Sequence, residues 1–214
     1  KVSLVNPETK RLTLGDADSN SIGTRSSDLM MAQIRAFGIV TSDPFWTDVM
    51  DSLYTMAKQV TDNYSPRTGI MPDFITGIPP RPVEPNFLES GTDGDYSWNA
   101  CRYPWRMAMD YIHYGCIDSR DLSVKFSTWA MASCHNDPNS FTANYKLDGT
   151  PIYSYTSSAF TSPLIVSAMT NPTSQEFMNR GWIYMRDAKD MYYSDSITLL
   201  CMLLVSGNWW VPED

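Results

Sequence analysis

Apolar side chains recur at helical spacing along most of this chain, and this pattern restricts the fold more than any other feature. Val49, Leu53 and Val60, for example, fall on one face of a helix. Turn-forming and helix-capping residues separate such stripes. Period-two alternation is confined to short pieces near residues 10–14 and 153–155, so we expect a mostly α fold. The pattern predicts about seven helices, over residues 28–38, 44–63, 97–114, 118–134, 158–170, 173–190 and 194–206.

Two long stretches, residues 70–96 and 136–157, carry no helical pattern. The first contains five prolines, and a proline removes a helical hydrogen bond, so this stretch cannot be helical throughout. Connections of this length inside a compact domain are usually functional. We therefore expect functional residues in or beside the first stretch.

The composition excludes several classes of protein. A chain of 214 residues with 43% hydrophobic residues fits one globular domain with a substantial core. A net charge of −8 would repel phosphate backbones, so we expect no nucleic-acid partner. A membrane-spanning helix needs about 18 consecutive apolar residues. The longest apolar run covers only residues 199–205, so we expect no membrane partner.

Most familiar catalytic and metal-binding motifs are missing from the sequence. His113 and His135 fall on different helices outside any metal-binding spacing, so we expect no metal. Neither a nucleophile elbow nor a glycine-rich phosphate loop occurs. The four cysteines form no Cys-x-x-Cys pair, which favours buried free thiols and leaves one disulfide as the alternative. Carboxylates and aromatic rings remain, and they are typical of enzymes that act on sugars.

These residue types are densest in residues 85–106. This segment joins the proline-rich stretch to a predicted helix and contains Glu89, Asp93, Asp95, Arg102 and Arg106 together with several aromatic residues. A helix N-terminus is electropositive and can orient a carboxylate or a polar ligand. The alternative interpretation is a solvated acidic loop followed by an ordinary helix start.

Residues 96–106 resemble the Y-x-(Y/W)-(D/N)-A-x-R-x-P-W-R stretch of glycoside hydrolase family 8. Three further segments match in the family's order. Residues 12–16 resemble its L-x-L-G-D turn, and residues 24–30 resemble the T-R-P-S-D-x-M of its chitosanase and lichenase branch. Residues 192–210 resemble its closing helix and S-G-N-(F/W) end. Four ordered motifs, spread over essentially the whole chain, make the resemblance specific.

The resemblance implies an all-α fold of the (α/α)6 barrel type. In such a barrel, antiparallel helical hairpins surround a common axis, and we expect both irregular stretches to gather at one rim. It also implies a secreted, inverting, endo-acting hydrolase of β-1,4 or mixed-linkage β-glycans, which needs no cofactor. Its partner would be a β-linked polysaccharide or oligosaccharide. The printed sequence begins without the apolar segment of a signal peptide, so such a peptide would have been removed or would lie upstream.

The chain departs from the family pattern at the general base. Asn99 stands where many members carry the catalytic Asp, and an amide cannot take a proton from water at neutral pH. Members of the chitosanase and lichenase branch instead use a Glu in a loop ending F-L-E, which residues 87–89 resemble. The resemblance therefore implies that Glu89 is the general base, with an engineered Asp-to-Asn change as the alternative. It also implies a set of substrate-binding residues: Asp28, Trp98, Asn99, Arg102 and Tyr193.

A second departure concerns the general acid. The family carries it in an S-E-G motif upstream of the L-G-D turn, and that motif does not occur here. Twelve helices also need more chain than the seven predicted. We therefore expect residues 1–214 to be the C-terminal part of one catalytic domain. The acid would come from the N-terminal half of that domain, and a second copy of this chain is the alternative partner.

Other interpretations predict different properties. A chitosanase of the same family is one alternative, because an acidic protein suits a cationic polymer. A non-catalytic β-glycan-binding fragment would keep the aromatic residues and lack the acid–base pair. For Trp98 and Tyr193 the alternative is core packing, and for Arg102 it is a structural ion pair. A helical scaffold for protein partners would instead expose large apolar patches, without a line of aromatic rings along a groove.

Overall fold

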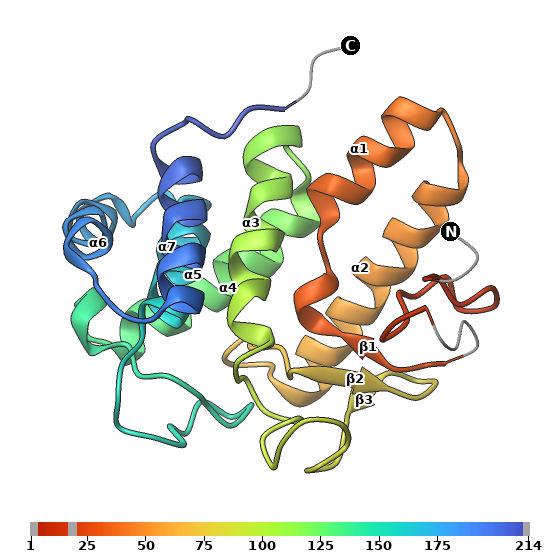
Figure 1. The fold of residues 1–214 in the computed structure, drawn as a ribbon, viewed down its shortest axis with the longest axis horizontal. Helices are drawn as coiled ribbons and strands as arrows, with labels where there is room; N and C mark the ends of the chain where they lie inside the picture. Colours follow the sequence, from red (N-terminus) through yellow and green to blue (C-terminus); the bar gives the residue numbers. More distant parts are fainter. Residues whose placement is uncertain (1–3, 17–20, 212–214) are drawn as a thin grey trace.

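The computed structural model describes residues 4–16 and 21–211, and within them the chain forms seven α-helices (Figure 1). The mostly helical fold and the number of helices agree with the prediction. The helices are α1 (Met31–Thr41), α2 (Phe45–Tyr64), α3 (Tyr103–Tyr114), α4 (Ile117–Ser133), α5 (Ser158–Ala168), α6 (Gln175–Asp187) and α7 (Tyr192–Val205).

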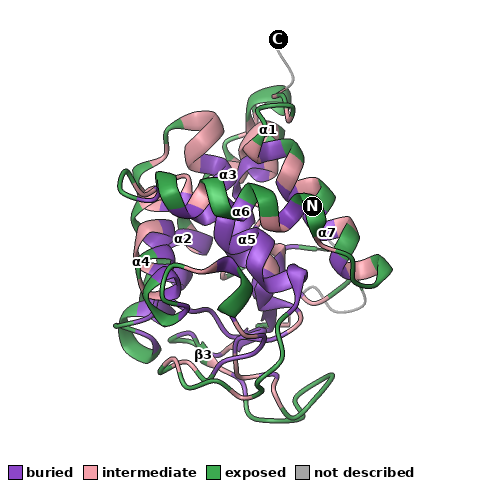
Figure 2. Ribbon diagram, turned by 90° about the vertical axis from the view of Figure 1, so that its left-hand side faces the viewer, coloured by how far each residue is buried: buried purple, intermediate pink, exposed green. Residues whose placement is uncertain are grey.

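The helices pack in two interleaved sets. The odd-numbered helices contact one another in chain order, α1 against α3, α3 against α5 and α5 against α7. Of the even-numbered helices, α2 packs against α1, α4 against α3 and α5, and α6 against α5 and α7. Helix α5 contacts α3, α4, α6 and α7, and every residue in it is buried (Figure 2). This succession of helical hairpins is the arrangement expected for part of an (α/α)6 barrel.

Two helix boundaries differ from the prediction. Helix α1 begins at Met31, after a 3-10 turn η1 (Ser26–Asp28), and it continues through Gly38 to Thr41. A glycine inside a helix costs only about 1 kcal/mol, so packing against α2 and α3 can override its tendency to end one. Helix α3 begins at Tyr103 instead of residue 97, because residues 98–99 form a turn and Ala100–Arg102 form the 3-10 helix η2.

The irregular stretches contain more order than the sequence suggested. Part of residues 70–96 forms β2 (Phe74–Thr76) and β3 (Arg81–Pro82), which join β1 (Thr24–Arg25) in an antiparallel sheet of order β1-β2-β3. Strands of two or three residues are too short to show a period-two pattern. Of the predicted weak strands, residues 10–14 make only an isolated bridge between Leu12 and Val5. Residues 153–155 make none, and the adjacent Thr156 bridges to Thr142.

The two irregular stretches lie at the same rim of the helices, as expected (Figure 1). Tyr96 and Tyr145 exchange backbone hydrogen bonds of 3.0 Å in an isolated bridge. Lys146 pairs with Asp95 at 2.8 Å and links the stretches a second time. The rim is therefore one connected surface built from segments about 50 residues apart in sequence.

Two apolar clusters fill the interior of the described chain. One is centred on α1 and α2, and the other is formed mainly by α3 to α7 with aromatic residues of the rim. All four cysteines are free, and Cys101, Cys134 and Cys201 are buried. Across residues 4–16 and 21–211, no helix is both long and apolar enough to span a membrane.

A buried carboxylate on α3 joins the first four helices. Asp110 accepts two hydrogen bonds from Arg35 of α1, from Nε at 2.8 Å and from Nη2 at 2.9 Å. Its Oδ2 also accepts the hydroxyl of Tyr54 from α2 and that of Ser119 from α4. Burial alone would raise the pKa of Asp110, but the Arg35 guanidinium and the Tyr54 hydroxyl hold that pKa below its usual range.

We expect Asp110→Ala to lower the free energy of unfolding by about 3 kcal/mol, because it leaves Arg35 and Tyr54 without their partner. Urea unfolding followed by circular dichroism measures this change. The control is Asp121→Ala, which removes only an exposed ion pair with Arg120 and should cost less than about 0.5 kcal/mol. Equal effects of the two substitutions would contradict the role assigned to Asp110.

Candidate active site

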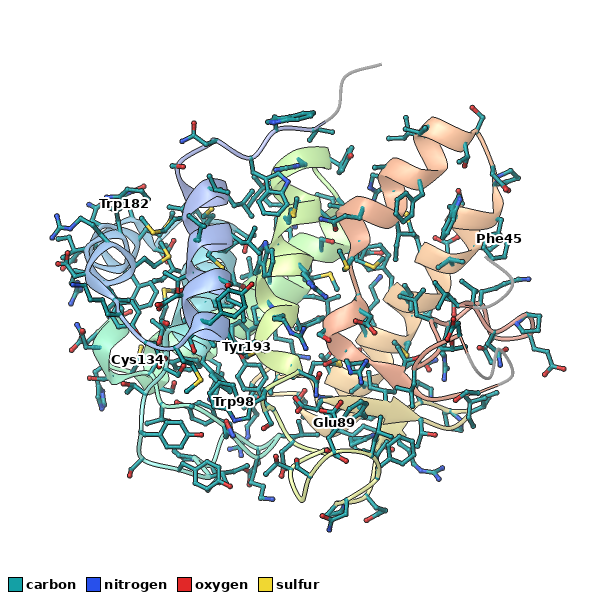
Figure 3. The ribbon with its side chains drawn as sticks, viewed as in Figure 1. Phe45, Glu89, Trp98, Cys134, Trp182 and Tyr193 are labelled. Carbon is teal, nitrogen blue, oxygen red and sulfur yellow. The ribbon has the colours of Figure 1, made fainter. Side chains whose placement is uncertain are left out.

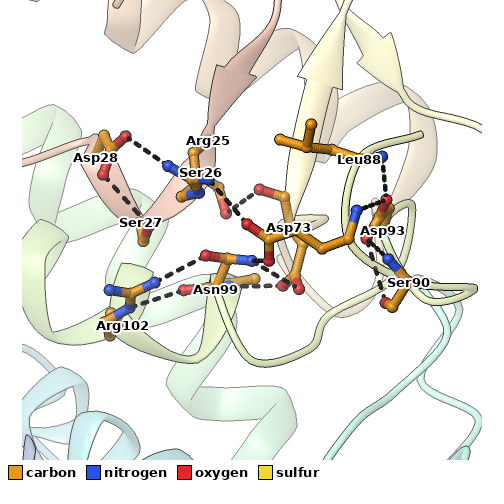
Figure 4. Close-up of polar contacts among 12 residues, drawn as sticks. Arg25, Ser26, Ser27, Asp28, Asp73, Leu88, Ser90, Asp93, Asn99 and Arg102 are labelled. Carbon is orange, nitrogen blue, oxygen red and sulfur yellow. Dashed lines mark hydrogen bonds and ion pairs between the residues drawn. The ribbon is translucent and has the colours of Figure 1, made fainter. Parts of the chain in front are cut away.

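A turn centred on Asp93 holds the loop that carries Glu89. The buried Asp93 carboxylate accepts the backbone N–H groups of Leu88, Glu89 and Ser90 at 2.7, 2.9 and 2.8 Å (Figure 4). Burial favours the protonated form of Asp93, but the hydrogen bonds outweigh it and lower the pKa of the carboxyl. Three charge-assisted bonds to consecutive residues therefore fix the loop backbone beneath Glu89.

The Glu89 carboxylate is held at both of its oxygens. Oε1 accepts Nη2 of Arg25 from β1 at 2.9 Å, and Oε2 accepts Nδ2 of Asn99 at 2.8 Å. The side chain is nevertheless 45% exposed. A carboxylate has about four acceptor positions, so two of them are open to a water molecule or a ligand.

Asn99 is fixed between a cation and two carboxylates. Its Oδ1 accepts Nη2 of Arg102 at 2.9 Å, so its Nδ2 faces Glu89 and, at 3.4 Å, Asp73 (Figure 4). An aspartate at this position would place a second negative charge beside Glu89 and would lack the N–H donors of the amide. The amide therefore suits a site whose base is Glu89, and nothing in the contacts requires an engineered change.

Asp73 is a buried carboxylate that the sequence analysis missed. It lies at the start of β2, and its Oδ1 accepts the backbone N–H groups of Ser97 and Ala100 at 3.0 and 2.6 Å. These bonds fix the turn before the 3-10 helix η2 (Ala100–Arg102) and present Asn99 to Glu89. Burial raises the pKa of Asp73 to about 7, although the hydrogen bonds favour its charged form. Its one sequence signal was an acid placed between apolar residues, directly after Pro72.

Aromatic rings form the other side of the site. Trp98 and Tyr193 meet edge to face with ring centroids 5.9 Å apart, and the Tyr193 hydroxyl donates to the Trp98 carbonyl oxygen at 2.6 Å (Figure 3). The Arg102 guanidinium lies 5.9 Å from the centre of the Tyr193 ring. An open hollow of about 300 Å³ is lined by Glu89, Trp98, Asn99, Arg102 and Tyr193. Five of the six predicted site residues therefore border one hollow.

Asp28, the sixth predicted residue, lies beside this hollow. Its carboxylate is 4.0 Å from Arg25 Nη1 and 3.9 Å from Arg106 Nη1. Arg25, which the sequence analysis also missed, thus contacts both Asp28 and Glu89. Arg106 donates to the Ser27 carbonyl oxygen, and its burial lowers its pKa to about 10.

The other acids near the loop are engaged elsewhere. Asp95 pairs with Lys146 at 2.8 Å, and the Asp93 carboxylate accepts backbone N–H groups of the loop. Within the described residues, Glu89 is the one carboxylate that borders the hollow. No cluster of three or more His, Cys, Asp or Glu residues suited to a metal occurs in this part of the chain.

A larger hollow of about 550 Å³ lies between α6 and residues 156–158 and 187–190. Several of its charged side chains already have structural partners. Asp137 caps a 3-10 turn, Asp190 accepts the Ser157 hydroxyl at 2.9 Å, and Arg180 pairs with Glu176. The smaller hollow at Glu89 is therefore the better candidate for chemistry.

The raised pKa of Asp73 leads to a prediction about pH. Between about pH 4 and pH 7 the folded chain keeps a proton that the unfolded chain has released. The contribution of Asp73 to stability is therefore complete below about pH 4 and is lost as the pH rises to 7, by at most about 1.4 kcal/mol per pH unit. In Asp73→Asn this component should vanish, so the wild type should lose stability relative to the variant between pH 4.5 and pH 7.5.

Urea unfolding at pH 4.5, 6 and 7.5 measures this difference, with Asp51→Asn as an exposed control on α2. An unfolding free energy that differs by a constant amount between wild type and Asp73→Asn would show that Asp73 does not titrate in this range.

Comparison with known proteins agrees with the fold. The chain is 42% identical over 203 residues to an endoglucanase of Bacillus sp. (strain KSM-330), covering 94% of this chain and 44% of the relative. It is 39% identical over 214 residues to a beta-glucanase of Niallia circulans, covering 96% and 52%. The chain thus spans about half the length of these curated relatives.

A solved structure has the same fold over nearly the whole of this chain. The apo structure of a beta-1,3-1,4-glucanase from Paenibacillus sp. X4 matches with a TM-score of 0.94 and 37% identity, over 98% of this chain and 57% of that one. The sequence pattern that defines glycosyl hydrolases family 8 matches residues 10–207. The chain therefore belongs to glycosyl hydrolase family 8.

Proposed function

We propose that the protein is an inverting, endo-acting hydrolase of β-glucan and that this chain supplies its general base and part of its cleft. The observation that carries the proposal is the single hollow bordered by Glu89, Asn99, Arg102, Trp98 and Tyr193. In an inverting enzyme one carboxylate activates water while an acid on the opposite face of the sugar protonates the leaving oxygen. Glu89 has the exposure and the free acceptor positions for the first role.

The neighbours of Glu89 have separate roles in this proposal. Arg25 and Asn99 hold the carboxylate in one orientation, so a water molecule that donates to a free acceptor position is also oriented. Arg102 fixes Asn99 and presents N–H groups to sugar hydroxyls. Trp98 and Tyr193 offer apolar ring surface to the C–H faces of the sugar, and Asp28 provides an acceptor at the edge of the hollow.

Mixed-linkage β-1,3-1,4-glucan or a cellulose-like β-glucan is the proposed substrate class. The support is that relatives at 37–42% identity are an endoglucanase, a beta-glucanase and a beta-1,3-1,4-glucanase by name. Chitosan is the alternative within the same family. Because such polymers do not cross membranes, we propose that the protein acts outside the cell.

The second carboxylate would come from a part of the domain that packs on α1 and α7. Both helices leave apolar side chains in solvent at the two ends of the α1-α3-α5-α7 series. On α1, Ile39 is 49% and Val40 is 76% exposed, and on α7, Leu199 is 60% and Leu203 is 37% exposed. Such surface is normally covered by another element. We propose that the other half of the barrel covers it and carries the acid.

The general-base role is tested by Glu89→Gln in the full-length protein. Loss of a general base typically lowers kcat by about 10²- to 10⁴-fold, and we expect KM to change little because the amide keeps the shape of the side chain. Reducing-sugar release from barley β-glucan, carboxymethylcellulose, xylan and chitosan measures turnover and substrate class together.

Glu84→Gln is the matched control, because Glu84 belongs to the same loop but lies outside the hollow. Asn99→Asp should not restore activity to Glu89→Gln, since its carboxylate would sit where the amide now contacts Arg102. Near-normal turnover in Glu89→Gln would exclude it as the base.

The 214-residue chain alone should release no reducing ends, because inversion needs carboxyl groups on both faces of the scissile bond. The measurement is turnover by the purified chain, shown by mass spectrometry to be free of any upstream peptide. A separately added N-terminal half should restore activity if it docks on α1 and α7, whereas activity that depends only on chain concentration would indicate a second copy. Clear turnover by the monomeric chain would contradict the proposal that the general acid and the general base come from different parts of the domain.

A further inference from the structure

Two exposed tyrosines form a stacked pair on the rim, outside the hollow at Glu89. Tyr153 is 47% and Tyr155 is 44% exposed. Their ring centroids are 5.5 Å apart with an interplanar angle of 24°. The two other aromatic residues of the 136–157 stretch, Phe141 and Tyr145, are buried. The rings of Tyr153 and Tyr155 therefore keep surface that is exposed to solvent and not packed in the core.

The backbone holds the pair in place. Tyr153 and Tyr155 are two residues apart, and their stacked rings lie on the same side of the segment. The segment is pinned by hydrogen bonds of 2.9 Å from Ile152 N to Asn144 O and from Ala143 N to Tyr155 O. Both rings therefore lose little further freedom when a ligand binds, which keeps the entropic cost of binding low.

The pair is continuous with the site. The Tyr155 hydroxyl lies close enough to the Trp98 side chain for the two to interact, and Trp98 itself packs against Tyr193. Asn144, at the base of the segment, donates to the Ser97 hydroxyl at 3.1 Å. A second open hollow, of about 640 Å³, is lined by Thr142 and residues 151–155. The aromatic surface that begins at Tyr193 and Trp98 thus continues through Tyr155 to Tyr153.

We propose that Tyr153 and Tyr155 form an additional sugar-binding platform, which holds units of a β-linked glucan chain beyond those at Glu89. The inference rests on the proposed function, since it extends the same cleft. An aromatic ring carries negative charge on its face, and a β-linked pyranose presents polarised C–H bonds on both of its faces. The phenol hydroxyls can also bond to the sugar hydroxyls around the ring edge.

The platform should contribute to the binding of long oligosaccharides and not of short ones. We expect Tyr153→Ala combined with Tyr155→Ala to weaken cellohexaose binding by roughly 2- to 10-fold and to leave cellotriose binding unchanged. Isothermal titration calorimetry with the 214-residue chain measures both affinities, and affinity electrophoresis in barley β-glucan extends the test to the polymer. Tyr153→Phe, which keeps the ring, should bind like the wild type.

Two further variants separate the platform from the cleft. Trp98→Ala should weaken the binding of both oligosaccharides, whereas Trp182→Ala, an exposed aromatic on α6 distant from Trp98, should change neither (Figure 3). If the double variant binds cellohexaose like the wild type while Trp98→Ala does not, the platform is disproved and the proposed function stands. If the wild type binds neither sugar, the cleft and the platform fail together.

Discussion

The Asp110 carboxylate has no exposed surface, and the packing of α1 to α4 depends on it. A buried charge is tolerated only when it is paired and its acceptor positions are filled. Arg35 supplies the opposite charge, and Tyr54 and Ser119 supply the remaining donors, each from a different helix. Because a misplaced helix would leave at least one of these groups unpaired, the network restricts how the first two helical hairpins can dock. Helix α3 contains Asp110 in its C-terminal half. Its N-terminal end, at Tyr103, follows Arg102 and adjoins the candidate site.

The candidate site also contains two neighbouring carboxyl groups, those of Asp73 and Glu89. Asp73 and Glu89 both accept from Asn99 just before α3, and charges on both carboxyl groups at once would repel each other. Asn99 separates them, because its amide nitrogen donates to both and its oxygen faces Arg102. Asp73 binds backbone N–H groups beneath the surface, while Glu89 keeps almost half of its side chain exposed. Burial thus distinguishes a carboxylate that supports the site from one that can meet a substrate.

Family membership and the completeness of the chain are separate matters. The match to residues 10–207 and the TM-score of 0.94 show the family and the fold. The matched relatives are about twice as long, and within the described residues the hollow contains one carboxylate. The exposed apolar residues on α1 and α7 lie on helices at the two ends of the series, where further helices of a barrel would pack. These observations are consistent with one another, and they make the origin of the acid the main question about this protein.

Sequence patterns predicted the helical class, the approximate helix limits and the place of Glu89 in the candidate site, because helical periodicity and ordered motifs are local properties of a chain. They also placed Trp98, Asn99, Arg102 and Tyr193 together, although Tyr193 is about 90 residues away, since the motifs that contain them match one family. Only the tertiary structure revealed the roles of Asp73, Arg25 and Asp110. Each of these residues acts through partners brought close by packing, and neither burial nor an ion pair between distant segments leaves a local sequence pattern. The short strands and the late start of α3 were hidden for the same reason, because the turn before α3 is fixed by hydrogen bonds from Ser97 and Ala100 to Asp73, a residue distant in the sequence.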